Sequence, residues 1–327
     1  MNRRDTLAAL LALGAVPLVA LAQEGARSFR VGFIVAAARP QSLESSAYGG
    51  FTKGMRELGY VEGKHFVMEW RFAEGNYERF PDLAAELVRL KVDVIVLSAG
   101  LAAPAAKRAT ATIPIVIGTA TDPVRSGFVA SLSRPGGNIT GLSSTSEVYV
   151  KCLDLLKNIV PGATRVAVLV NPGNPGHIAL LEMLHPAART VGVTILPVNA
   201  RSQEEIERGF AQMKRERAQG LIVPSDSFFF KQRSPIAELA ARNRLPSIYS
   251  SREYVEAGGL MSYGQPLSEF YRHAAAYVDK IFKGANPGDL PVEQPTRFEM
   301  AINGRIAKEL SIKIPSELLL RADEVIE

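Results

Sequence analysis

Cysteine is almost absent from this sequence, since Cys152 is the only one among 327 residues. A single thiol excludes an intramolecular disulfide, a metal or iron–sulfur site built from several cysteines, and a racemase mechanism that needs two. Cys152 lies in a helix-like apolar run, residues 151–156, where a half-buried thiol is the expected role. We therefore expect no disulfide and no cysteine chemistry.

The sequence also lacks the short motifs of common enzymes. It has four histidines, which form no H-E-x-x-H or other close metal-ligand spacing: His65, His177, His185 and His273. There is no G-x-S-x-G elbow, and Gly59–Lys64 does not have the spacing of a phosphate-binding loop. We expect surface or helix histidines, no metal, no cofactor and no enzymatic activity. An enzyme on the same fold is the alternative, because acidic residues are plentiful.

No long run of one charge is present. Lys and Arg number 38 against 33 Asp and Glu, and this net charge of +5 is scattered, so we expect no nucleic-acid partner. Hydrophobic residues make up 47% of the chain and charged residues 22%, which is the composition of a folded globular protein. At this length the sequence predicts two domains or two lobes.

The first 22 residues are predicted to be a secretory signal peptide. Arg3 and Arg4 precede an apolar stretch over Thr6–Leu21, and Ala20-Leu21-Ala22 is an A-x-A-like cleavage site. The stretch is too short for a stable membrane span, and no cysteine follows it to carry a lipid. The arginine pair resembles a twin-arginine signal without its usual aromatic residue, so the Sec and Tat routes both stay open. We expect cleavage near Ala22 and a mature protein in the periplasm.

Beyond the signal, short runs rich in β-branched residues alternate with longer segments of helical period, which indicates parallel strands joined by crossover helices. The first half predicts strands at residues 29–35, 66–71, 92–97 and 115–118, with helices near 48–58, 80–90 and 104–111. The second half predicts strands at residues 166–170, 193–198, 221–223 and 247–249, with helices near 178–190, 206–217 and 236–243. The arrangement of elements repeats although the residues hardly do.

Turn-rich residues 133–141 are expected to end the first half and carry the chain across. Residues 260–263 and 267–282 predict an extra strand and helix, and residues 291–302 another extended segment. If the chain crosses back, lobe 1 comprises 29–142 plus about 260–285, and lobe 2 comprises 143–259 plus about 290–327. A simple C-terminal extension is the alternative. The predicted fold class is α/β, with two Rossmann-like lobes of parallel strands joined by a multi-strand hinge.

Several stretches, in this order, resemble a known family. They are Arg56–Lys64, Asp93–Val96, Ile113–Val116, Thr121–Val124, Arg134–Gly141 and Ile314-Pro315. They are similar to the substrate-binding proteins of ABC transporters with the type-1 periplasmic-binding fold, in the branch that includes tryptophan and tyrosine receptors. The resemblance spans nearly the whole mature chain. It implies two lobes that close on a small ligand and a closed form that permease subunits recognise.

The resemblance implies the role more firmly than the ligand. The loop Ala36–Arg39 departs from the aromatic-amino-acid receptors, so their ligand is not carried over. We expect an amino-acid-like or carboxylated small molecule, ABC permease subunits as partners, and a monomer. A periplasmic sensor that signals to a receptor kinase is the alternative, because the same closure serves either partner.

Ligands of open α/β sheets bind outside the carboxyl ends of the strands, so the loops there are the candidate site. The first half contributes Ala37, Ser42, Ser98, Ala99, Gly100, Leu101, Thr119 and Asp122. Residues 98–102 are the candidate seat for an anion, because small residues allow close approach and the following helix directs free amides at them. A tight strand-to-helix turn is the alternative.

The second half contributes candidates of the same kind. They are Ser143, Ser144, Asn171, Asn174, Ser225, Asp226, Tyr249 and Tyr263. Asp226 is expected to pair with an ammonium group of the ligand, and a cap on the next helix is the alternative. Tyr263 is either an aromatic wall of the site or a core residue. For Phe228–Phe230 we expect packing more than ligand contact.

Overall fold

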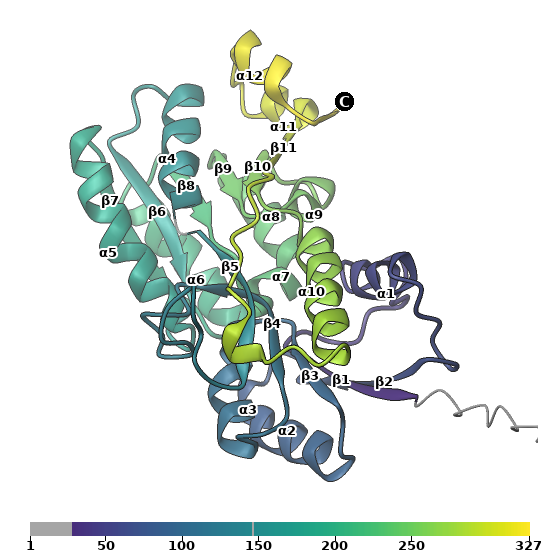
Figure 1. Ribbon diagram of the computed structural model, residues 1–327. Helices are drawn as coiled ribbons and strands as arrows, with labels where there is room; N and C mark the ends of the chain where they lie inside the picture. The colour runs from purple at the N-terminus through teal and green to yellow at the C-terminus, as the bar shows by residue number, and fades with distance from the viewer. Residues whose placement is uncertain (1–27, 146) are drawn as a thin grey trace, which may run out of the picture.

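The computed structural model describes residues 28–145 and 147–327, and the predicted signal peptide, residues 1–22, lies outside these ranges. Within them the chain forms two α/β lobes, each a mostly parallel sheet with helices on both faces (Figure 1). The predicted class of two Rossmann-like lobes is confirmed. No helix in the described ranges is both long and apolar enough to cross a membrane.

The first lobe is built on a five-stranded sheet in the order β2-β1-β3-β4-β5, with every neighbouring pair parallel. Its strands are β1 (Phe29–Val35), β2 (Phe66–Phe72), β3 (Val94–Leu97), β4 (Ile115–Thr121) and β5 (Ile139–Ser144). Alternate side chains of a strand face opposite sides of its sheet. Phe33 therefore packs with one core cluster and Ile34 with the other.

Four helices cover the two faces of this sheet. On one face lie α1 (Gly49–Glu57) and α10 (Leu267–Phe282), and on the other α2 (Phe80–Arg89) and α3 (Ala103–Ala109). Short 3-10 turns, η1 (Tyr77–Arg79) and η2 (Gly100–Ala102), precede α2 and α3. The helix α10 joins this core from a position far along the chain.

The second lobe has seven strands in the order β12-β11-β10-β9-β8-β6-β7, and only the β10–β11 pair is antiparallel among the described residues. They are β6 (Arg165–Val170), β7 (Thr194–Asn199), β8 (Gly220–Val223), β9 (Ser247–Tyr249), β10 (Met261–Gly264), β11 (Glu299–Asn303) and β12 (Glu324–Ile326). One face is covered by α4 (Glu147–Ile159), α5 (Pro175–Thr190), α11 (Gly304–Glu309) and α12 (Ser316–Arg321). The other is covered by α6 (Gln203–Arg215), α7 (Ser227–Lys231), α8 (Arg233–Arg242) and α9 (Arg252–Glu256).

Two segments differ from the sequence prediction. The strand β10 was expected to belong to the first lobe, but it pairs with β9 and β11 and so lies in the sheet of the second lobe. The turn-rich stretch before the crossing ends in β5, which forms the edge of the first sheet. The first difference leaves the strand pattern unchanged, because a β-rich run does not specify which sheet it joins. The second adds a fifth strand to the four that the sequence predicts for this half.

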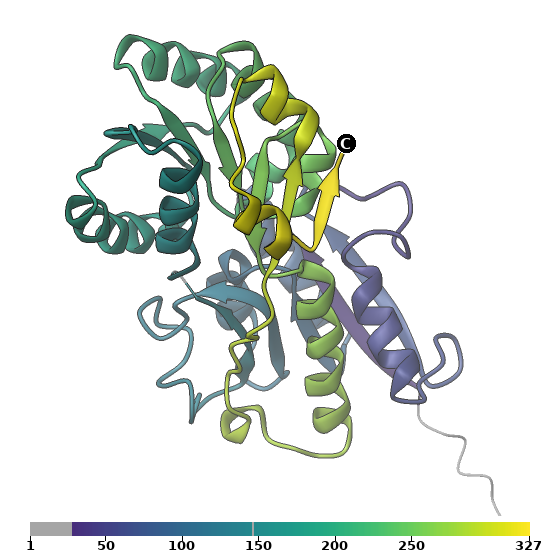
Figure 2. The ribbon, with the colours of Figure 1, turned by 90° about the horizontal axis from the view of Figure 1, so that it is seen from above.

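The chain passes between the lobes three times: between β5 and α4, between β10 and α10, and between η3 (Pro287–Asp289) and β11 (Figure 2). The first and third crossings lie side by side. The Ser143 N–H donates to the Glu293 carbonyl at 2.9 Å, and the Glu293 N–H donates to the Gly141 carbonyl at 3.1 Å. The Gln265 side-chain amide donates to the Pro295 carbonyl and so links the second crossing to the third.

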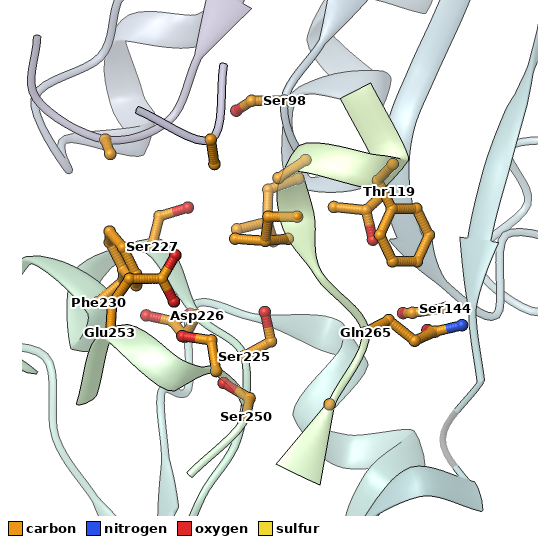
Figure 3. Close-up of a pocket in the computed structure, with 18 of the residues that line it drawn as sticks. Ser98, Thr119, Ser144, Ser225, Asp226, Ser227, Phe230, Ser250, Glu253 and Gln265 are labelled. Atoms are coloured by element: carbon orange, nitrogen blue, oxygen red, sulfur yellow. The ribbon is translucent and has the colours of Figure 1, made fainter. Parts of the chain in front are cut away.

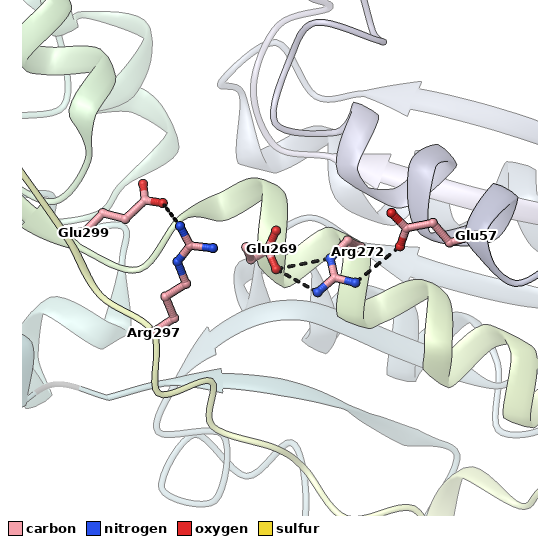
Figure 4. Close-up of polar contacts among 5 residues, drawn as sticks. All are labelled: Glu57, Glu269, Arg272, Arg297 and Glu299. Carbon is pink, nitrogen blue, oxygen red and sulfur yellow. Dashed lines mark hydrogen bonds and ion pairs between the residues drawn. The ribbon is translucent and has the colours of Figure 1, made fainter. Parts of the chain in front are cut away.

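Ion pairs lie next to the second and third crossings (Figure 4). Arg272, near the start of α10, pairs with Glu269 at 2.9 Å and with Glu57 of α1 at 3.3 Å. Arg297 pairs with Glu299 at 3.1 Å where the third crossing enters β11. These pairs link the ends of the crossing segments to elements of their own lobes.

Candidate functional site

A cavity of about 720 Å³ lies between the two lobes, at the carboxyl ends of the strands (Figure 3). Loops of the first lobe form one wall and loops of the second lobe form the other, with Gln265 of the second crossing between them. Parallel strands place their carboxyl ends at one edge of each sheet, and ligands of such folds bind there. The two edges face each other across this cavity, which we call the cleft.

Ser98, directly after β3, is held in the first wall by two hydrogen bonds. Its hydroxyl oxygen accepts the Ala36 N–H at 3.0 Å, and its carbonyl accepts the hydroxyl of Tyr271 at 3.1 Å. The Ser98 hydroxyl oxygen is the acceptor in the bond to Ala36, so its own O–H is still able to donate, and Ser98 lines the cleft. The next turn begins with Gly100, where an added Cβ would lie 2.7 Å from the Ala120 Cβ, so only glycine fits.

Thr119 reaches the first wall through an irregularity in β4. The pairing of β4 with β5 shifts register between Ile117 and Ala120, which is a bulge in the strand. A bulge changes the direction of the side chain it carries. The Thr119 hydroxyl lines the cleft and has no hydrogen-bond partner among the described residues. Near it, at the end of β5, the Ser144 hydroxyl lies 3.1 Å from that of Thr121.

In the second wall, the Asp226 carboxylate is hydrogen-bonded to groups of the protein itself. The side chain is 6% exposed, and its carboxylate accepts the N–H groups of Phe228 and Phe229 at 2.9 and 3.1 Å, which caps α7. The side-chain amides of Asn171 and Asn174 donate to it at 3.1 and 3.0 Å. The helix cap, which the sequence left as the alternative, is the role that the structure gives to Asp226. A carboxylate with this many donors has little capacity left for a ligand.

Glu253, in the first turn of α9, is the other carboxylate of this wall, and its side chain has no hydrogen bond or ion pair within the described ranges. Figure 3 places it on the same wall as Asp226 and Phe230. Three serine hydroxyls on that wall, those of Ser225, Ser227 and Ser250, also lack partners in the described part of the chain. The second wall therefore offers one carboxylate without a partner, several neutral acceptors, and the cationic side chains of Lys231 and Arg233.

Twelve of the sixteen predicted site residues line the cleft. They are Ala37, Ser42, Ser98, Ala99, Gly100, Leu101, Thr119, Ser144, Asn174, Ser225, Asp226 and Tyr263. The structure thus brings together most of the predicted loops from both halves of the sequence. Whether each side chain contacts a ligand stays a prediction.

Four predicted residues do not line the cleft. Ser143 is fully buried, because it alternates with Ser144 along β5, and Tyr249 is buried in a stack with Tyr254 at 4.7 Å between ring centroids. Asn171 lies behind Asp226 and holds it. Asp122 accepts the Arg125 N–H at 3.0 Å in a local turn. These residues shape the walls without reaching the cavity.

The structure also places the aromatic candidates and one histidine near the cleft. Tyr263 lines the cleft and stacks on Phe298 at 5.4 Å. Within Phe228–Phe230, Phe229 is buried as expected while Phe230 lines the cleft. His177 lies on α5, in agreement with the prediction of surface or helix histidines, and it is 3% exposed, with Nδ1 accepting the Asn171 N–H at 2.9 Å.

Sequence reasoning did not select several residues that line the cleft. Glu253, Ser227 and Ser250 lie in loops it had nominated, but nothing in the sequence distinguished their free groups from those of their neighbours. Gln265 and Phe128 gave no signal. They reach the cleft from a crossing and from the loop after β4, and only the folded chain brings these segments to it.

Known proteins share this architecture and about a quarter of the aligned residues. The chain is 26% identical over 264 residues to a tyrosine-binding protein of Clostridioides difficile, a match that covers 81% of this chain and 76% of that protein. A conserved domain protein of Vibrio cholerae superposes with a TM-score of 0.86 at 28% identity, covering 91% of this chain and all of that one. An ABC domain of Streptococcus pneumoniae in complex with L-Trp superposes with a TM-score of 0.82 at 26% identity, covering 90% and 100%.

The same comparisons extend to more distant periplasmic binding proteins. A leucine-binding protein of Thermotoga maritima, at 12% identity, superposes with a TM-score of 0.61, which supports the type-1 fold alone. The sequence profile of the ABC transporter substrate-binding proteins matches residues 34–326, nearly all of the described chain. Two lobes, a cleft between them and this match agree, and the chain belongs to the family of ABC transporter substrate-binding proteins.

Proposed function

We propose that the cleft binds an amino acid or a closely related zwitterion and that the lobes close on it. The observation that carries this proposal is a pair of complementary free groups on opposite walls. Glu253 of the second lobe has a carboxylate without a partner in the described chain, and Ser98 and Thr119 of the first lobe have hydroxyls free to donate. A ligand with one cationic and one anionic end satisfies both walls and favours closure.

Glu253 is the proposed acceptor for the ammonium group, in place of Asp226. An ammonium group has three N–H donors. The Glu253 carboxylate can accept one, and the hydroxyl oxygens of Ser225 and Ser250 on the same wall can accept the others. All three bonds have an ionised donor, but only the Glu253 bond also has an ionised acceptor, so it makes the largest polar contribution of this wall.

The carboxylate end is proposed to lie at the turn after β3. Ser98, Thr119 and the first two residues of η2, Gly100 and Leu101, all line the first wall. Amides at the start of a helical turn have no partner within it and accept a negative group readily. Phe230 and Phe128, from opposite lobes, leave an apolar region for the ligand side chain.

The test is calorimetry of the purified mature chain with L-tyrosine and L-tryptophan, the amino acids bound by two relatives. We expect at least one to bind, and Glu253→Gln to weaken its binding about 10- to 100-fold, because one hydrogen bond to a charged group contributes about 1.5–3 kcal/mol. The deaminated analogue 3-(4-hydroxyphenyl)propionate is expected to bind wild type and variant equally weakly.

The matched control is Glu256→Gln on the same short helix, since Glu256 pairs with Arg252 at 2.9 Å outside the cleft. It should leave affinity unchanged. Equal affinity for L-tyrosine in Glu253→Gln and wild type would reject the ammonium role of Glu253. Failure of every amino acid to bind would reject the ligand class.

We also propose that the chain works as the exported component of an ABC importer. The family membership supports delivery of ligand to permease subunits, and the predicted signal at residues 1–22 supports a periplasmic location. Capture of the ligand requires only closure of the lobes, so we assign no catalytic residue. One chain supplies both walls of the cleft, which is consistent with a monomer. The intact mass of chain recovered from the periplasm, expected to begin near Gln23, tests the export step.

A further inference from the structure

Direct protein contacts bridge the two lobes beside the cleft. Arg125, in the loop after β4, forms an ion pair with Glu182 of α5, and both side chains are about half exposed. The Lys231 ammonium of the second lobe donates to the Glu74 carbonyl of the first at 3.4 Å. The start of α5 lies close to β4, since a Cβ added at Gly176 would be 3.4 Å from that of Thr121.

Tyr77 is a lobe-1 residue whose hydroxyl is covered in this arrangement. The hydroxyl is buried and has no hydrogen-bond partner among the described residues. Its ring lies 4.0 Å from the position of a Cβ at Gly173, in the loop before α5. Burial raises the pKa of the Tyr77 phenol, and the charge of Asp226 in the second lobe raises it further, while the nearby Phe228 N–H and Ser227 hydroxyl, which do not reach hydrogen-bond geometry, lower it. The phenol thus lies at the lobe interface, beside a carboxylate.

The Arg125–Glu182 ion pair and the buried Tyr77 hydroxyl have opposite effects on the free energy of closure. Bringing together Arg125 and Glu182 is favourable, and it is possible only when the lobes are close. Burying a hydroxyl without a partner is unfavourable, and opening the cleft returns it to water. The first favours the closed form and the second opposes it, so the balance between open and closed depends on side chains that need not touch the ligand.

We propose that Arg125 and Glu182 form a clasp that populates the closed form without ligand, and that the buried hydroxyl of Tyr77 limits this population. Closure is then a property of the chain itself, and a ligand adds to a closed population that already exists. The proposal depends on the two-lobed structure and not on which ligand binds.

The experiment measures the distance between the lobes in ligand-free protein by double electron–electron resonance. Spin labels are attached at Asp82→Cys on α2 and Arg189→Cys on α5, two exposed positions in different lobes. The natural Cys152 is 1% exposed and burial raises its pKa, so it does not take up label. Two distance populations, open and closed, are expected.

We expect Arg125→Ala to lower the closed-to-open ratio about two- to five-fold, the range for an exposed ion pair. The exchanged pair Arg125→Glu with Glu182→Arg should restore it. Tyr77→Phe, which removes the unpaired hydroxyl and keeps the ring, should raise the ratio about five-fold or more.

Two variants inside single lobes serve as controls. Arg242→Ala removes an exposed ion pair with Glu238 at 3.6 Å, and Tyr60→Phe removes a tyrosine hydroxyl bound to Asp279 at 3.0 Å. Neither should change the ratio. An unchanged ratio in Arg125→Ala, or no restoration by the exchanged pair, would overturn the clasp. A lower ratio in Tyr77→Phe would overturn the role given to the phenol. L-Tyrosine calorimetry is independent of both results.

Discussion

At the scale of single residues, His177 shows how the second wall is held in place. Its Nδ1 accepts the Asn171 N–H, so the ring carries its proton on Nε2, which lies 3.3 Å from the Ser225 carbonyl. The ring also stacks on Phe229 at 5.9 Å. The histidine thus connects β6, α5 and the loop that presents Ser225 and Asp226. Protonation of Nδ1 would remove its acceptor and break the bond to Asn171.

This geometry predicts a pH dependence of stability. Burial lowers the pKa of His177 below its unfolded value of about 6.5, although the nearby charge of Asp226 acts in the opposite direction. The unfolded chain then binds more protons than the folded chain, so stability is full above about pH 6.5 and falls as pH decreases through the interval down to the folded pKa. The slope from this group is at most about 1.4 kcal/mol per pH unit.

Urea unfolding at several pH values between 5 and 8 measures this slope. His177→Gln should be less stable at pH 8 but lose part of the decrease toward pH 5. His185→Gln, on the same helix, should keep the wild-type profile. An identical pH profile for His177→Gln and wild type would contradict the role of the buried ring.

The same residues show how far the site was predictable. Asp226 and Glu253 both follow strands of the second lobe, and the sequence favoured Asp226. The structure uses Asp226 to cap α7 and to receive two asparagine amides, and it leaves Glu253 free. Which carboxylate is hydrogen-bonded within the protein depends on side chains from several loops. Asn171, for example, lies 55 positions away from Asp226. The ends of the strands predict which loops line the site. Which side chains in those loops keep a polar group without a partner depends on the packing of the folded chain.

At the scale of elements, strand and helix spans were largely predictable. Periodicity alone placed β1, β9 and α10 at their observed bounds, because each has a clear apolar pattern between turn residues. The lobe to which β10 belongs was not predictable, because its partners β9 and β11 lie on either side of a long helix in sequence. The packing of α10 on α1 depends likewise on contacts between distant segments.

The α1–α10 contact depends on two glycines of α1. A Cβ at Gly54 would lie 2.7 Å from the Arg272 carbonyl and 2.9 Å from the Ala275 Cβ, and one at Gly50 would meet the Ser268 backbone. We therefore expect Gly54→Ala to lower the free energy of unfolding by about 1–3 kcal/mol, since overpacking forces backbone shifts. Urea denaturation is the measurement.

Gly162→Ala is the matched control for this substitution. No atom lies within 4 Å of a Cβ added at Gly162, so the change should stay within about 0.5 kcal/mol. Equal stability of Gly54→Ala and wild type would show that α10 can move away from α1 at no cost, and the close packing of these helices would not be needed.

At the scale of the whole molecule, the first lobe is discontinuous in sequence. Its core on one face contains Phe33 and Phe51 from the N-terminal part together with Phe270, Tyr271 and Tyr277 from α10. The chain between them builds most of the second lobe. The chain on either side of α10 joins the two lobes, and α10 itself supplies part of the core of the first lobe. The closure of the lobes and the folding of the first lobe therefore depend on the same part of the chain.

This arrangement predicts that residues 28–144 do not fold alone. Without α10, the side chains of Phe33, Phe51 and Met55 lose their cover, and each large apolar side chain contributes about 1.5–3 kcal/mol when fully buried. The isolated fragment should bind a hydrophobic dye and unfold without a cooperative transition in urea.

Joining residues 265–291 to it through a flexible linker should restore cooperative unfolding, because α10 can then dock on α1. The same fusion with Ala275→Asp, which places a charge in the α1–α10 contact, should not restore it. Cooperative unfolding of residues 28–144 alone would mean that the first lobe does not need α10, and the crossings would then serve the hinge only.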